Sequence, residues 1–129
     1  HPEYRRQRQM CIRDRLIIDN IGMLSSIYKY GKIAFIGGGF RGALHNTLEA
    51  VVWNLPVIYG NHKNNRKFLE VDRIEKEGIG FPIKNGNEFK LIKNRILKNR
   101  DIGKGGNEFI IKNSGATEKI SYHLTKYIK

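Results

Sequence analysis

An amide and a carboxylate follow a run of three glycines in the first half of the chain. The glycines are Gly37, Gly38 and Gly39, and the polar side chains are Asn46 and Glu49. Glycines let a backbone approach a ligand closely, and the start of a helix offers unpaired N–H groups to a phosphate. On a helix, Asn46 and Glu49 would share a face because they are three positions apart. A strand, a glycine turn and a helix with such a pair are typical of α/β domains that hold a nucleotide.

The same residues also fit an ordinary turn followed by a helix. A glycine-rich loop after a strand is a weak signal by itself, and a carboxylate such as Glu49 suits the first turn of any helix. His45 lies beside the pair, where an imidazole could help to hold a phosphate or could simply pack or cap the helix. Spacing therefore leaves the nucleotide site and the plain turn as open alternatives.

Apolar periodicity predicts strands that alternate with helices. Short apolar or β-branched runs predict strands at residues 16–18, 33–36, 56–59 and 78–83. Helical spacing predicts helices at residues 19–30, 44–54, 65–77, 88–98, 107–113 and 116–129. In the helix at 65–77 we expect Phe68, Leu69, Val71 and Ile74 to point inward. The alternation predicts an α/β fold with a parallel sheet of three or four strands, as in the second half of a Rossmann-like domain.

The composition argues against a metal site and an internal disulfide. The chain has 129 residues, enough for one domain at most, and a single cysteine, Cys11. Its four histidines, His1, His45, His62 and His123, do not have the spacing of metal ligands. We therefore expect no bound metal and no cofactor.

The chain is strongly basic, with a formal net charge of +12. Such a charge raises nucleic acid and anionic membranes as partners. The lysines are spread through the C-terminal half without an aromatic-studded ribbon or a known binding motif, so we expect no nucleic-acid partner. An anionic membrane surface and an ordinary solvated surface remain the two interpretations of this charge.

Residues 1–15 differ from the rest of the chain. They contain five arginines and no apolar periodicity. Residues 6–15, RQRQMCIRDR, resemble a translated sequencing-adapter peptide, so we treat residues 1–15 as artefactual or disordered and leave them out of the fold prediction. A genuine basic tail is the alternative.

Four segments follow one another in a specific order: DNIGML at 19–24, GGG at 37–39, HNTLEA at 45–50 and PVIYG at 56–60, before Lys67 and Phe68. They resemble the C-terminal domain of the 3-deoxy-D-manno-octulosonic acid (Kdo) transferases of lipopolysaccharide synthesis. That family has Asp-x-x-Gly-Glu-Leu, a strand ending in Gly-Gly-Ser/Gly, His-Asn-x-Leu-Glu-Pro/Ala, and a Pro-Val strand with Gly-Pro. This chain departs from the pattern at Met23, where most members carry Glu, and at residues 61–65, which contain no proline.

The resemblance implies a two-domain GT-B glycosyltransferase that transfers Kdo from CMP-Kdo to a lipid A precursor. Residues 16–129 would form part of its C-terminal, CMP-sugar-binding domain. The acceptor domain and the catalytic base would lie in a missing part, so no catalytic residue is assigned here and the chain alone is expected to be inactive. The complete enzyme would work at the cytoplasmic face of the bacterial inner membrane, held peripherally or anchored through the missing N-terminal part. Alternatives are another GT-B transferase with a different nucleotide sugar, and a basic non-catalytic domain that binds polyanions.

The resemblance also assigns the donor site. The nucleotide-binding residues would be Gly22, Met23, Leu24, Asn46, Thr47, Leu48 and Glu49. Glu49 would accept hydrogen bonds from the ribose hydroxyls, a strong arrangement because the acceptor is charged. Contacts to the phosphate or to the Kdo carboxylate would come from Gly38, Gly39, Arg41, His45 and Asn61, although Arg41 could equally be a solvated charge.

Overall fold

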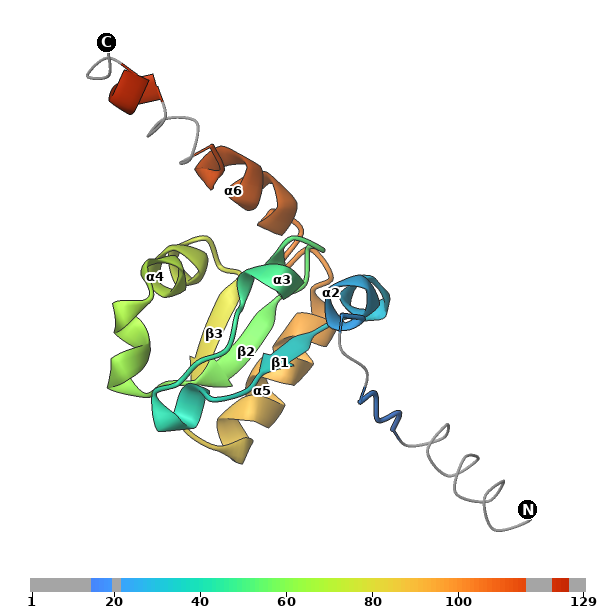
Figure 1. Ribbon diagram of the computed structural model, residues 1–129. Helices are drawn as coiled ribbons and strands as arrows, with labels where there is room; N and C mark the ends of the chain where they lie inside the picture. Colours follow the sequence, from blue (N-terminus) through green and yellow to red (C-terminus); the bar gives the residue numbers. More distant parts are fainter. Residues whose placement is uncertain (1–14, 20–21, 116–121, 126–129) are drawn as a thin grey trace.

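A three-stranded parallel sheet forms the centre of the molecule (Figure 1). The computed structural model describes residues 15–19, 22–115 and 122–125. The strands β1 (Ala34–Ile36), β2 (Val57–Gly60) and β3 (Gly80–Ile83) lie in the order β1-β2-β3, with Ala34 beside Val57 and Val57 beside Gly80. Helices connect consecutive strands, as parallel pairing requires. The predicted α/β class with a parallel sheet is therefore confirmed.

The strand predicted at residues 16–18 is wrong. Leu16 and Ile17 are 72% and 75% exposed, and these residues belong to no strand. A β-branched run favours extended backbone, but a strand also needs a neighbouring strand and a surface to pack on. In contrast, every residue of β2 is buried, because β2 has a strand on each side and helices on both faces.

The helices are shorter and more divided than the periodicity predicts. The segment expected as one helix at 44–54 contains only a four-residue helix, and the segment at 65–77 begins with a 3-10 turn. The helical elements are α2 (Leu24–Ile27), η1 (Tyr28–Tyr30), η2 (Gly39–Arg41), α3 (Leu48–Val51), η3 (Lys63–Lys67), α4 (Leu69–Lys76), α5 (Gly86–Lys98) and α6 (Gly106–Asn113). Most of the helix predicted at 116–129 lies outside the described residues. None of the described helices is long and apolar enough to cross a bilayer.

Helices cover both faces of the sheet (Figure 1). On one face, α3, α4 and α6 bury side chains such as Val51, Ile74 and Phe109 against β1 and β2. On the other face, Ile96 of α5 packs with Ile58 of β2. The predicted inward positions Val71 and Ile74 are fully buried, whereas the prediction for Leu69 is wrong, because it opens α4 at 75% exposure.

Two glycine backbones meet where the chain leaves β1 and β2. A Cβ atom on Gly60 would lie 2.3 Å from the amide nitrogen of Phe40, and a Cβ atom on Gly39 would lie 2.6 Å from the amide nitrogen of Gly60. Asn65 bridges the contact, since its Nδ2 donates to the carbonyl oxygens of Gly39 and Gly60, both at 2.8 Å. This contact fixes the glycine loop to the end of the central strand.

We expect Gly60→Ala to lower the free energy of unfolding by roughly 2–3 kcal/mol, because overpacking against a backbone has few ways to relax. The control is Gly86→Ala in α5, where an added Cβ meets no atom within 4 Å, and we expect a change within about 0.5 kcal/mol. Urea denaturation measures both variants. Equal stability of the two variants would contradict the close backbone contact.

A buried phenol connects β2 to α4. The Tyr59 hydroxyl donates to Glu75 Oε1 at 2.8 Å, and Arg66 Nη1 donates to Glu75 Oε2 and to Asp72 Oδ1, both at 2.7 Å. Burial, the hydrogen bond to Glu75 and the charge of that carboxylate raise the pKa of Tyr59 far above its ordinary value. The folded protein therefore holds this phenol in its neutral form well into the alkaline range.

We expect Tyr59→Phe to lower the free energy of unfolding by about 1 kcal/mol near pH 8, because Glu75 loses a part-buried hydrogen bond. A raised folded-state pKa means that the unfolded chain loses the phenol proton first as pH rises above about 10. The stability difference between the wild type and Tyr59→Phe should therefore fall by about 1.4 kcal/mol between pH 9 and pH 11, so that the wild type loses its advantage by pH 11. Urea denaturation of both proteins at the two pH values measures this advantage, and a pH-independent advantage would contradict the raised pKa.

Candidate functional site

A cavity of about 440 Å³ opens beside the carboxyl end of β1. Binding sites of parallel α/β sheets are usually found at this end of the strands. Residues from three parts of the chain line it: α2 with η1, β1 with the first glycine of its loop, and the segment leading into α3. The lining residues are Leu24, Tyr28, Phe35, Ile36, Gly37, His45, Asn46 and Glu49.

A hydrogen bond from the start of α3 holds the Asn46 side chain in place. Its Oδ1 accepts a hydrogen bond from the backbone nitrogen of Leu48 at 3.0 Å, so it satisfies one of the free amides at the start of α3. The expected arrangement of Asn46 and Glu49 on one helix is wrong, because α3 begins only at Leu48. The two side chains nevertheless line the same cavity. The Asn46 amide nitrogen has no protein acceptor among the described residues and can donate to a ligand.

Glu49 brings a negative charge to the cavity, and this charge affects the pKa of Tyr28. Burial and the Glu49 carboxylate raise the pKa of the Tyr28 phenol above its ordinary value. At neutral pH the cavity thus combines a carboxylate acceptor, a neutral phenol and the free amide donor of Asn46. This set of groups suits a ligand with hydroxyls and amide-like edges, such as a nucleoside.

The glycine loop shapes the cavity mainly through its fold. Gly38 has a φ of 82°, and a Cβ atom there would lie 2.0 Å from the carbonyl oxygen of Ala43. The loop then returns so that the His45 nitrogen donates to the Gly37 carbonyl oxygen at 3.0 Å. Gly37 lines the cavity, whereas Gly38 and the buried Gly39 are not among the lining residues.

The structure brings four of the predicted site residues together: Leu24, His45, Asn46 and Glu49. The others lie outside the cavity lining, namely Gly22, Met23, Gly38, Gly39, Arg41, Thr47, Leu48 and Asn61. Thr47 is 1% exposed, and Leu48 packs against the main core. Arg41 and Asn61 are exposed, and the Asn61 backbone nitrogen continues the sheet ladder by donating to the Ile83 carbonyl oxygen at 3.0 Å.

Sequence reasoning did not assign Tyr28, Phe35 or Ile36 to the site. Tyr28 lies four positions after Leu24, so the helical spacing that predicts a core stripe also places both on the side facing the cavity. Phe35 lies inside a predicted strand and was therefore not considered as a site residue. Its side chain is half-exposed, because β1 is an edge strand among the described residues. Among the described residues, no group of three or more His, Cys, Asp or Glu side chains could hold a metal ion.

Comparison with known proteins gives several relatives, although no family model matches the chain. The 3-deoxy-D-manno-octulosonic acid transferase of Aquifex aeolicus is 42% identical over 76 residues, which are 58% of this chain and 21% of the relative. The enzyme of the same name from Haemophilus influenzae is 28% identical over 118 residues, or 86% of this chain and 27% of the relative. A bifunctional glycosyltransferase/methyltransferase of Fusobacterium nucleatum is 31% identical over 75 residues, or 57% of this chain and 12% of the relative.

The chain thus spans about a quarter of the length of the transferases that it matches. The resemblance drawn from its ordered motifs is confirmed by these matches. The chain is therefore similar in sequence to part of the 3-deoxy-D-manno-octulosonic acid transferases.

Proposed function

We propose that residues 16–129 are part of the CMP-sugar-binding domain of a GT-B glycosyltransferase that transfers Kdo from CMP-Kdo to a lipid A precursor. One observation carries the proposal. Leu24 of one family-like motif and His45, Asn46 and Glu49 of another line one cavity at the carboxyl end of a parallel strand. The similarity to named Kdo transferases supports the same reaction.

The reaction displaces CMP from the anomeric carbon of Kdo by an acceptor hydroxyl. In this proposal the chain binds the leaving nucleotide: Glu49 accepts from the ribose hydroxyls and the Asn46 amide donates to the nucleoside. Tyr28 lines the cavity from η1 and offers the ligand a neutral hydroxyl. The base that removes the acceptor proton belongs to a second domain outside these 129 residues, so the chain alone is expected to bind donor without turning it over.

The proposed partners are CMP-Kdo, a lipid A precursor reached through the second domain, and the anionic membrane that carries this acceptor. We place the complete enzyme at the cytoplasmic face of the inner membrane. Residues 16–129 have 19 basic and 10 acidic residues, and their net charge of +9 supports an anionic surface as a neighbour, since a basic residue close to such a membrane contributes about 1 kcal/mol.

A related transferase with a different donor is the second candidate. The similarity to the bifunctional glycosyltransferase/methyltransferase of Fusobacterium nucleatum favours it, because that protein carries a different activity name. CMP and UDP separate the two candidates, since the proposed Kdo transferase should bind CMP more tightly. A non-catalytic polyanion-binding domain would instead ignore both nucleotides and bind polyanions with a steep dependence on salt.

We expect Glu49→Ala to weaken CMP binding by about 1–3 kcal/mol, the scale for losing a charged hydrogen-bond acceptor. The matched control is Glu77→Ala, which removes an exposed carboxylate that does not line the cavity and should leave CMP affinity unchanged. Calorimetric titration of the chain with CMP measures each dissociation constant. Equal CMP affinity in the two variants would overturn the role given to Glu49.

A further inference from the structure

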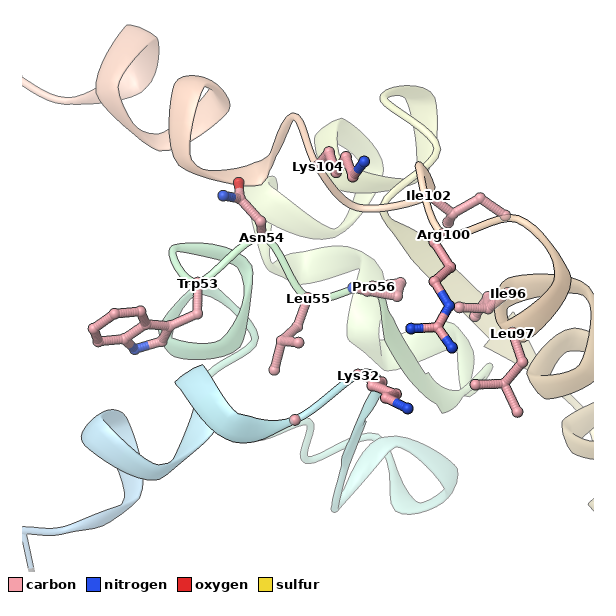
Figure 2. Close-up of a pocket in the computed structure, with 11 residues that line it drawn as sticks. Lys32, Trp53, Asn54, Leu55, Pro56, Ile96, Leu97, Arg100, Ile102 and Lys104 are labelled. Carbon is pink, nitrogen blue, oxygen red and sulfur yellow. The ribbon is translucent and has the colours of Figure 1, made fainter.

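A second cavity, of about 210 Å³, lies at the amino ends of β1 and β2 (Figure 2). The turn before β1, the connection from α3 to β2, the last turn of α5 and the connection from α5 to α6 form its walls. Its lining includes Lys32, Leu55, Pro56, Ile96, Leu97 and Arg100. The first cavity opens at the carboxyl end of β1, so the two cavities lie toward opposite ends of the sheet.

Two cations of this cavity lack an acidic partner among the described residues. Figure 2 shows the side chains of Lys32 and Arg100 directed to the same side of the cavity, next to Leu97. A third cation, Lys104, is already paired, with its Nζ 2.7 Å from Asp101 Oδ1. No carboxylate lines the cavity, so a ligand there meets two uncompensated positive charges.

The walls of the cavity are held by specific contacts. Gly103 has a φ of 92°, and a Cβ atom there would lie 2.6 Å from Pro56 Cδ, so the α5–α6 connection packs directly on the segment before β2. Asn54 has a φ of 61°, and its Oδ1 accepts from the Asn107 backbone nitrogen at 2.8 Å. The Asn107 amide in turn donates to the Val52 carbonyl oxygen at 3.0 Å. These contacts preorganise the cavity, which lowers the cost of ordering it around a ligand.

We propose that this cavity binds a small amphipathic phosphate, with the phosphate between Lys32 and Arg100 and a short apolar group against Leu55, Ile96 and Leu97. A guanidinium presents paired donors that match phosphate oxygens, and the neighbouring ammonium adds a second charge. The volume corresponds to roughly seven water molecules, which admits a phosphate and a few carbon atoms. The proposal does not depend on the donor site, because the two cavities share no lining residue.

Trp53 is one of the lining residues and the only tryptophan of the chain, so its fluorescence gives a readout of binding, although Figure 2 shows its indole directed away from Lys32 and Arg100. We expect hexyl phosphate to change its fluorescence saturably, with a dissociation constant at least tenfold below that of inorganic phosphate. Hexanol should give no saturable change. Lys32→Gln and Arg100→Gln should each raise the dissociation constant for hexyl phosphate about tenfold, since each removes one of two charges at the phosphate.

The matched control is Lys76→Gln, which removes an equal charge from α4, outside the cavity, and should change the dissociation constant less than twofold. Glu49→Ala should also leave hexyl phosphate binding unchanged, so failure of the donor-site proposal would be seen separately. Equal affinity of Arg100→Gln and Lys76→Gln, or no binding heat for hexyl phosphate in a calorimetric titration, would overturn the proposal.

Vesicles distinguish two sources of the ligand. Phosphatidic acid vesicles that produce the same Arg100-dependent change of Trp53 fluorescence, where phosphatidylcholine vesicles do not, would support a membrane lipid as the source. A response to hexyl phosphate alone would support a soluble phosphate ester.

Discussion

The contact between the backbones of Gly39 and Gly60 determines where the candidate donor site forms. Gly60 ends the central strand and Gly39 follows the edge strand, so their contact holds the glycine loop against the carboxyl edge of the sheet. Asn65 is 2% exposed and donates to both glycine carbonyl oxygens, which satisfies two buried acceptors where no side chain could enter. His45 and Asn46 lie where they do because the loop returns from this fixed point. The glycines therefore contribute to the site chiefly by allowing two backbone segments of the chain to come into contact.

Among the described residues β1 has a neighbouring strand on one side only, and the first cavity lies beside it. Phe35 is half-exposed and packs edge-to-face on Phe89 of α5, with ring centroids 5.9 Å apart. With Leu24 and Ile36 it gives the cavity an apolar wall, onto which Asn46 and Glu49 add a small number of directed polar groups. Apolar walls with a few placed polar groups are the usual composition of a small-molecule site. The central strand, which is buried on both faces, could not provide such a surface.

Patterns that involve long-range burial were predictable from the sequence, and patterns set by local hydrogen bonds were not. The strands at 33–36, 56–59 and 78–83 were identified because burial demands apolar runs at those positions. The start of α3 was misplaced by four residues, because periodicity cannot show that Asn46 Oδ1 accepts a hydrogen bond from the backbone nitrogen of Leu48. Residues 16–18 have the composition of a strand, but composition does not reveal whether a neighbouring strand is present.

The lining of the cavity beside β1 was predictable in part. Motif resemblance named Leu24, His45, Asn46 and Glu49, and all four line the cavity. It did not separate them from Thr47 and Leu48, which occupy the same motif but face the protein interior. Tyr28 was not assigned to the site because its helical spacing from Leu24 fits a core position equally well.

The charges of the two cavities suggest a division of tasks within the molecule. The cavity beside β1 is lined by one carboxylate and by no lysine or arginine, so its electrostatics favour the uncharged hydroxyls of a nucleoside over a phosphate. A nucleotide bound there would direct its phosphate toward the glycine loop and beyond it, where backbone N–H groups, His45 or another domain must compensate the charge. The cavity at the opposite end of the sheet has the reverse composition, with Lys32 and Arg100 and no carboxylate. The two positive charges of this cavity favour a phosphate over an uncharged nucleoside. Because the two cavities share no lining residue, a ligand in one does not block the other.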